Sequence, residues 1–98
     1  MLIRIVKMSF KENNTPLFLA NFNKNKSKIR NFSGCRLLEL YRDTDNPNIF
    51  FSYSYWDNEA CLQDYRNSDF FKKVWNTTKV LFKEKPEAWS VQKMDSLT

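Results

Sequence analysis

Residues 49–56 read IFFSYSYW, and this stretch decides the fold. Aromatic and β-branched residues dominate it and no Gly or Pro interrupts it, so it predicts a β-strand. Successive side chains of a strand point to opposite faces of its sheet. One face would carry Ile49, Phe51, Tyr53 and Tyr55, and the other Phe50, Ser52, Ser54 and Trp56. Neither face carries a charge, so we expect both to be covered.

Two more strands and a helix are predicted on the N-terminal side of this stretch. Residues 2–10 (LIRIVKMSF) predict a first strand. Residues 35–42 (CRLLELYR) predict a second, joined to residues 49–56 through the turn DTDNPN as an antiparallel hairpin. Between them, Thr15 is expected to cap a helix that has Pro16 in its first turn and runs to about Asn31. The apolar stripe of this helix would contain Leu17, Phe18, Phe22 and Ile29.

The C-terminal half predicts a divided helical region and a last strand. A helix capped by Asp57 or Asn58 begins at Glu59, and a break at residues 67–69 separates it from a second helix over residues 70–82. The buried stripe of that second helix would contain Phe71, Val74, Trp75, Thr78 and Phe82. Pro86 ends the helical region, residues 88–94 form a strand, and residues 95–98 form a frayed tail. Gly34, the only glycine, would supply a backbone conformation that other residues avoid.

The order βαββαβ predicts a single α+β domain of the ferredoxin-like type over residues 1–98. Its antiparallel sheet would carry the helices on one face, and two helices cannot cover the other face as well. A second copy packed sheet to sheet would bury the uncharged rings of residues 49–56, so we expect a homodimer in the form of a dimeric α+β barrel. A monomer with a tyrosine-rich wet face is the alternative.

Composition narrows the function classes. The net charge is +5, but the Lys and Arg residues are scattered, and the densest run (Lys24, Lys26, Lys28, Arg30) would spread around a helix. A nucleic-acid partner is therefore not expected, and an anionic small molecule fits better. Histidine is absent, which excludes His-ligated metals and Ser-His-Asp or Cys-His catalysis. Two cysteines, no secretory signal and no apolar run of membrane length favour a cytoplasmic protein with reduced thiols and no membrane contact.

Several stretches resemble the antibiotic-biosynthesis monooxygenase (ABM) family of dimeric α/β-barrel proteins. They are residues 51–75 (FSYSYWDNEACLQDYRNSDFFKKVW), residues 32–43 (FSGCRLLELYRD) and residues 2–10. Members of this family have a strand that ends in Trp, a polar pair, Glu-Ala and a helix, and then a Ser and an aromatic residue that open the next helix. The matching residues are Trp56, Glu59, Ala60, Ser68, Phe70 and Phe71.

The resemblance implies oxidation of aromatic polyketides, quinols or haem with O₂, in several members without metal or flavin. We therefore expect no cofactor and no metal site. Many members carry His where this chain has Tyr65. The haem-degrading branch has its iron-ligating His at the place of Trp75 and an Asn at about that of Ile5, and of its Asn-Trp-His set only Trp56 remains. Haem degradation of that type is therefore not expected.

Trp56 and Tyr65 are the predicted catalytic residues, and Ser52 and Ser54 leave space beside Trp56. If this face looks toward the helices, the pocket would be lined by Phe22, Ser52, Ser54, Phe71 and Trp75. Tyr65 could donate a hydrogen bond to a substrate oxygen or act as an acid-base group if its pKa were lowered. The alternative is that the two Trp side chains belong to the core and that the Tyr65 hydroxyl lies in water.

Four other residues are weighed as site residues. Arg36, Arg42 and Arg66 could hold an anionic or phenolate group, although such arginines commonly lie on surfaces. Cys61 is either a reactive thiol or, as its lack of a His partner favours, a small buried residue. The function predicted from these residues and the resemblance is a cofactor-independent monooxygenase acting on a small aromatic or quinol-like substrate. The alternatives are a non-catalytic small-ligand-binding or stress-associated protein on the same dimeric scaffold and a nucleic-acid-binding protein.

Overall fold

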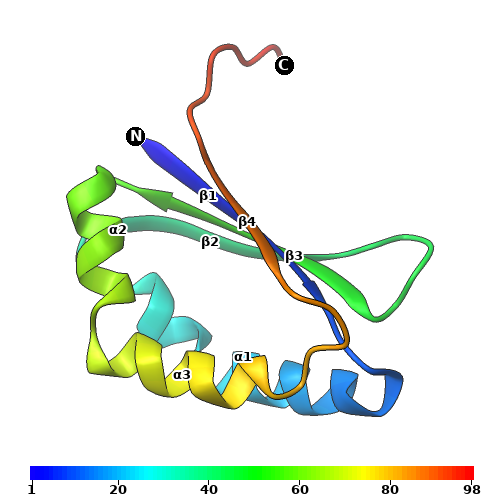
Figure 1. The fold of residues 1–98 in the computed structure, drawn as a ribbon. Helices are drawn as coiled ribbons and strands as arrows, with labels where there is room; N and C mark the ends of the chain where they lie inside the picture. The colour runs from blue at the N-terminus through cyan, green and yellow to red at the C-terminus, as the bar shows by residue number, and fades with distance from the viewer.

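The computed structural model of the protein describes all 98 residues. In chain order, its elements are β1 (Leu2–Ser9), the short 3₁₀ helix η1 (Glu12–Asn14), α1 (Thr15–Arg30), β2 (Cys35–Arg42), β3 (Ile49–Trp56), α2 (Glu59–Arg66), α3 (Asp69–Lys79) and β4 (Glu87–Val91). The strands form one sheet in the order β2-β3-β1-β4 with every neighbouring pair antiparallel. This is the predicted ferredoxin-like α+β fold, in which α2 and α3 together take the place of the second helix (Figure 1).

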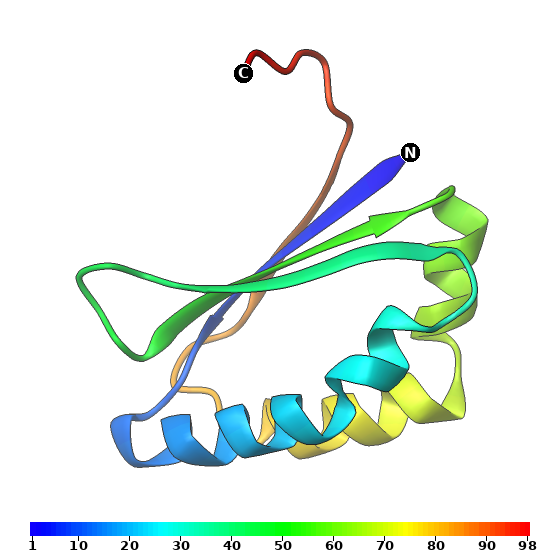
Figure 2. The same cartoon turned by 180° about the vertical axis from the view of Figure 1, so that it is seen from behind.

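All the helices lie on one face of the sheet. Figures 1 and 2 show α1 and α3 side by side beneath the sheet, with α2 standing at one end. Two groups of buried side chains fill the layer between them. One surrounds Trp56 at the end where α2 lies, and the other surrounds Phe10, Phe18 and Phe50 at the opposite end. A cavity remains between these two groups, as described below.

Two polar side chains fix where α2 and α3 begin. Asn58 caps α2 by accepting a hydrogen bond from the Cys61 N–H, and Ser68 caps α3 by accepting one from the Phe71 N–H. The expectation that Thr15 caps α1 was wrong. Thr15 is already helical, and its hydroxyl donates to Asn48 Oδ1 at 2.7 Å, which ties α1 to the turn between β2 and β3.

Other boundaries also differ from the sequence prediction. Phe82 lies beyond α3, because the chain has turned to pair Phe82 with Phe10, whose ring stacks on it at 5.2 Å. β4 ends at Val91 and not at Met94, because Val91 already pairs with Ile3 near the start of β1. Leu17 is 56% exposed and does not join the buried stripe of α1, because it lies one residue out of phase with Phe18.

The other face of the sheet carries no helix. There β3 presents Phe51, Tyr53 and Tyr55 in the predicted phase, since Phe50 and Trp56 point to the helices. Tyr41 and Tyr53 meet edge to face at 5.3 Å. Tyr41 is 48% exposed and Trp89 on β4 is 44% exposed. We call this surface the outer face; no helix covers it, and Lys93 of the C-terminal tail lies over the Tyr55 ring, with its Nζ 5.6 Å from the ring centre.

Candidate functional site

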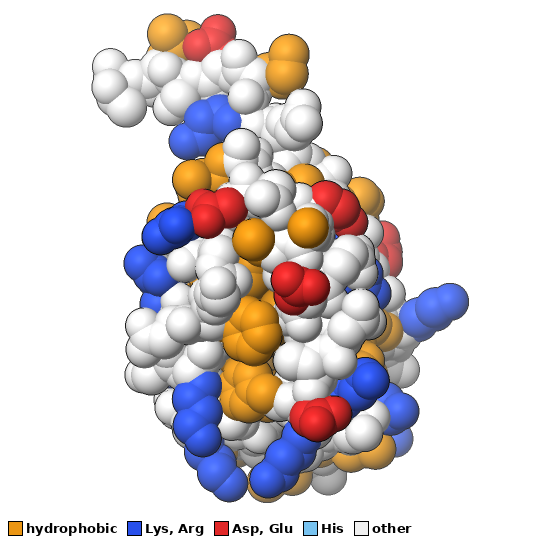
Figure 3. Space-filling model, turned by 90° about the vertical axis from the view of Figure 1, so that its left-hand side faces the viewer, with side chains coloured by type: hydrophobic (Ala, Val, Ile, Leu, Met, Phe, Trp, Pro, Cys, Tyr) orange, Lys and Arg blue, Asp and Glu red, His pale blue; other side chains and the backbone are white.

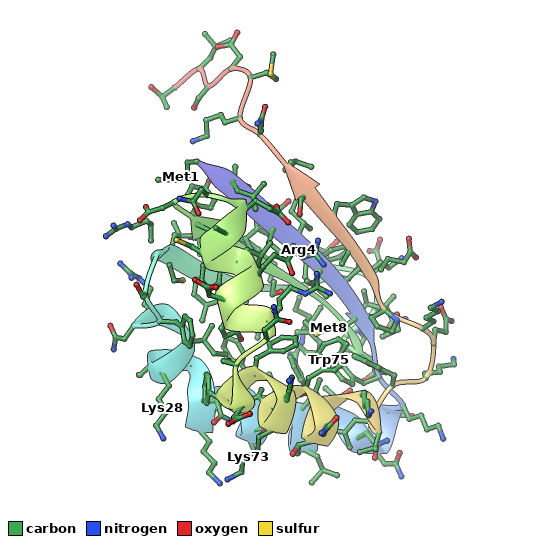
Figure 4. The ribbon with its side chains drawn as sticks, turned by 60° about the vertical axis from the view of Figure 1, so that its left-hand side comes forward. Met1, Arg4, Met8, Lys28, Lys73 and Trp75 are labelled. Atoms are coloured by element: carbon green, nitrogen blue, oxygen red, sulfur yellow. The ribbon has the colours of Figure 1, made fainter.

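A cavity of about 410 Å³ lies between the sheet and the helices. Side chains from β1, β3 and all three helices line it, and most of them are apolar. Figure 4 shows Arg4, Met8 and Trp75 within this space, whereas Lys28 and Lys73 point away from it. Figure 3 looks at the end of the molecule where α2 lies and shows apolar side chains in a strip between polar and charged ones. The volume falls in the range of pockets that hold small molecules.

All seven site residues predicted from the sequence line this cavity. They are Phe22 on α1, Ser52, Ser54 and Trp56 on β3, Tyr65 on α2, and Phe71 and Trp75 on α3. The two serines share the helix-facing side of β3 with Trp56, and their small side chains leave the space that larger residues would fill. Rings from three helices close it from the other side. That these residues bind or transform a ligand stays a prediction.

Trp56 lies behind the cavity surface. Its side chain is fully buried, with 0% exposed, and its indole N–H donates to Ser54 Oγ at 2.9 Å. The indole ring stacks on the Tyr65 ring. The only polar atom of the Trp56 side chain is therefore already paired within the protein. This geometry suits a residue that holds Ser54 and Tyr65 in place.

Tyr65 brings a polar group to the cavity. Its ring packs against Trp56, Phe32 and Phe71, yet its hydroxyl makes no hydrogen bond within the protein. No fully buried side-chain oxygen or nitrogen lacks a partner, so this hydroxyl reaches accessible space. Burial raises the pKa of Tyr65 well above its ordinary value. The phenol therefore stays protonated at neutral pH and can donate a hydrogen bond, but it is a poor base.

A paired polar group forms another part of the wall, and the sequence analysis missed it. Asn21 Nδ2 on α1 donates to Thr78 Oγ1 on α3 at 3.2 Å, and Thr78 Oγ1 donates to the Val74 carbonyl at 2.8 Å. Asn25 in turn donates to Asn21 Oδ1 at 3.1 Å. These bonds join α1 to α3 below the sheet. Thr78 had been placed on the buried stripe of its helix, but the polar face of α1 gave no sign that Asn21 would meet it.

The three candidate arginines lie in different places in the structure. Arg66 lines the cavity, but Arg36 and Arg42 do not. Arg36 forms a two-pronged ion pair with Asp57 at 2.7 and 2.8 Å on the surface. Arg42 lies over the Phe50 ring with its guanidinium carbon 4.8 Å from the ring centre.

Arg4 on β1 lines the cavity too and was missed. Its phase could have revealed it, because Val6 and Met8, two and four residues further on, point to the same face. Arg4 Nη1 donates to Ser90 Oγ at 3.0 Å. Burial, and then the positive charge of Arg66, lower the pKa of Arg4, and the negative charge of Glu59 offsets this only in part.

The two cysteines are free and lie outside the cavity lining. Cys61 is partly buried against the Trp56 group. Cys35 is buried, and burial raises the pKa of its thiol. No group of three or more acidic or cysteine side chains is arranged to hold a metal ion. None of the helices combines the length and the hydrophobicity of a membrane span.

Solved structures with this fold are numerous. The structure of an antibiotic biosynthesis monooxygenase superposes with a TM-score of 0.90 over 97% of this chain and 100% of that one, at 17% identity. A conserved protein from Methanosarcina mazei superposes with a TM-score of 0.88 over 95% of this chain and 93% of that one, at 22% identity. A protein from Mycobacterium tuberculosis superposes with a TM-score of 0.88 over 99% of this chain and 98% of that one, at 14% identity. Likeness at these identities establishes the fold.

Sequence comparison establishes the family. None of the curated proteins matches the sequence. The sequence model of the family described as antibiotic biosynthesis monooxygenase matches residues 1–76, which is most of the chain and includes β1, β3, α2 and most of α3. The chain therefore belongs to the antibiotic biosynthesis monooxygenase family.

Proposed function

We propose that this protein is a monooxygenase that oxidises a small aromatic or quinol-like molecule in the cavity between sheet and helices without a bound cofactor. The observation that carries the proposal is the Tyr65 hydroxyl, an unpaired donor that opens onto an apolar cavity of about 410 Å³. Phe22, Phe71 and Trp75 offer ring surfaces on which an aromatic molecule can pack. Membership of the family supports the same reaction class.

The reaction uses electrons from the substrate itself. In the oxidation of an electron-rich ring CH₂ to a carbonyl, one atom of O₂ becomes the carbonyl oxygen. The other leaves as water with the two hydrogens removed from the carbon. The substrate would lose a proton to water at the open part of the cavity, and Tyr65 would donate a hydrogen bond to the substrate oxygen and stabilise the negative charge left there before O₂ reacts. The surrounding rings would exclude water and so strengthen that hydrogen bond.

Oxygen uptake tests this function. The wild-type protein is mixed with a panel of hydroquinones, naphthoquinols and anthrones in an oxygen-electrode cell. We expect uptake above the autoxidation rate that scales with protein concentration for at least one compound, and no product under argon. Uptake that stays at the buffer rate across the panel would contradict the proposal.

A non-catalytic small-ligand-binding protein is the second candidate, and one observation favours it. The cavity lining contains no carboxylate, thiol or imidazole, and the pKa of Tyr65 is raised. No lining side chain is therefore suited to take a proton from a substrate near neutral pH. Saturable binding of an aromatic ligand whose O₂ uptake stays at the background rate would support this candidate.

We also infer that a second copy covers the outer face and completes a dimeric barrel. β3 contributes only uncharged side chains to that face, and the exposed Tyr41 and Trp89 extend it over β2 and β4. A contiguous surface of this kind is unusual on a monomer. The two free thiols fit a reducing compartment such as the cytoplasm.

A further inference from the structure

Two arginines in the lining of the cavity form no ion pair within the protein. Arg4 comes from β1 and Arg66 from the last turn of α2, and both line the same space. The lining contains no Asp or Glu, and the only ion pair in the protein joins Arg36 to Asp57 on the surface. Two cations set close together repel each other. An arginine removed from water without a negative partner also loses solvation. The Glu59 carboxylate acts on Arg4 from outside the lining, but it only partly offsets burial and the charge of Arg66, since the pKa of Arg4 is still lowered. The arrangement therefore favours a negative charge supplied by a ligand.

The surroundings of Arg4 hold its guanidinium in place for such a charge. The residues paired with Arg4 on the neighbouring strands are Ser54 and Ser90, whose small side chains leave it room on the helix-facing side of the sheet. A single hydrogen bond from Nη1 to Ser90 Oγ fixes one edge. A guanidinium has five N–H donors, so most of them remain for a ligand. Arg66 is exposed, which means that the part of the cavity it lines is open to solvent.

We propose that the natural ligand is an aromatic molecule with an ionised acid group, and that this group binds between Arg4 and Arg66 while the ring lies in the apolar interior. The proposal rests on the proposed function in taking this cavity as the ligand site, but it does not require that the ligand be oxidised. Arg66 at the open part would attract the acid group first. Arg4, deeper against the sheet, would then bind it with paired N–H groups.

The test uses two fluorescent probes that share one skeleton. 8-Anilinonaphthalene-1-sulfonate carries a sulfonate, and N-phenyl-1-naphthylamine lacks it. Both are titrated into the full-length wild-type protein and the variants Arg4→Gln, Arg66→Gln and Lys73→Gln. Lys73 is the matched control, because it also carries one positive charge but points away from the cavity (Figure 4).

We expect the wild type to bind the sulfonate probe at least tenfold more tightly than the neutral probe. Each arginine substitution should weaken sulfonate binding about tenfold, the size of one charge-assisted hydrogen bond, and leave the neutral probe within about twofold. Lys73→Gln should change neither. Equal affinities of the wild type for the two probes would overturn the proposal, and so would an equal loss of sulfonate binding in Lys73→Gln.

A fallback variant and a second measurement, O₂ uptake, keep the outcomes distinct. Should Arg4→Gln fail to fold, Arg66→Gln decides alone, since the Arg66 side chain is exposed and makes no hydrogen bond within the protein. Anion preference without O₂ uptake would support the arginine site and contradict the monooxygenase. Uptake with a neutral quinol and no anion preference would do the reverse.

Discussion

The indole ring of Trp56 stacks on the phenol ring of Tyr65, with ring centres 5.0 Å apart and planes inclined by 29°. Trp56 is the last residue of β3 and Tyr65 lies near the end of α2, so this stack joins the sheet to the helix that stands at its end. The two residues have different roles at the site. Trp56 is fully enclosed and paired to Ser54, while Tyr65 offers a free hydroxyl to the cavity.

Tyr65→Phe should separate function from stability. The substitution keeps the stacked ring and removes a hydroxyl that has no partner in the protein, so the free energy of unfolding should change by less than about 0.5 kcal/mol. Loss of the donor should lower substrate oxidation, or ligand affinity if the protein only binds, about tenfold. Urea unfolding and oxygen uptake measure the two effects. Tyr55→Phe on the outer face is the control, and an undiminished rate in Tyr65→Phe would exclude a role for the hydroxyl.

Trp56→Phe should mainly affect stability. The smaller ring leaves a gap in the core and Ser54 Oγ without its donor, which together cost about 1–3 kcal/mol in the free energy of unfolding. Oxygen uptake per folded molecule should fall less than in Tyr65→Phe, because no polar atom of Trp56 faces the cavity. A variant with unchanged unfolding but abolished oxidation would instead show that the indole takes part in the chemistry.

Most of the fold could be predicted from the sequence because local signals agreed with the tertiary arrangement. The alternation of residues 49–56 predicted which side chains share a face of β3, and the structure shows that the face with Ser52, Ser54 and Trp56 is the one toward the helices. Errors arose where tertiary contacts decided the outcome. Phe82 fits the spacing of a helix, but pairing with Phe10 removes it from α3, and Thr15 uses its hydroxyl for Asn48 and not as a cap.

The site was predictable only in its apolar part. Large rings can be recognised from their spacing in a strand or a helix, and Phe22, Phe71 and Trp75 do line the cavity. The positions of charged side chains are harder to predict, because they depend on partners that the sequence does not show. Arg36 forms an ion pair with Asp57 on the surface. Arg4 faces inward because it has the same phase in β1 as the buried Met8.

Alkaline pH should destabilise the protein through Tyr65 and Cys35. Burial raises both pKa values, from ordinary values of 10.0 and 9.0. Above about pH 9 the unfolded chain releases protons that the folded protein retains, so the free energy of unfolding falls as pH rises, by up to about 1.4 kcal/mol per pH unit for each group. Urea unfolding at pH 7, 9, 10 and 11 measures the fall. Tyr65→Phe should reduce its slope above pH 10, and an unchanged slope would exclude a contribution from Tyr65.

Gly34→Ala should destabilise the protein by about 2 kcal/mol or more. Gly34 has φ +86°, a conformation that costs other residues energy, and a Cβ there would lie 2.5 Å from Cys61 Cβ. The loop before β2 would have to move away from α2. Thermal unfolding followed by circular dichroism measures the loss. The exposed neighbour Ser33 provides the control Ser33→Ala, which should be neutral, and equal melting temperatures of Gly34→Ala and the wild type would refute the packing argument.

Tyr53→Arg should dissociate the proposed dimer without unfolding the protomer. Tyr53 lies on the outer face near its middle, opposite Glu39 on β2 and Ile5 on β1. A guanidinium there could pair with Glu39, but the sheet-to-sheet contact would then have to remove this ion pair from water, which costs free energy. Sedimentation velocity should give a dimer for the wild type and a monomer for the variant at the same concentration. Leu17→Arg adds the same charge at an exposed apolar site on α1 and should remain a dimer. A wild type that sediments as a monomer up to about 100 μM, well above the dissociation constants of stable dimers, would refute the barrel, and dissociation of Leu17→Arg alone would move the interface to the helices.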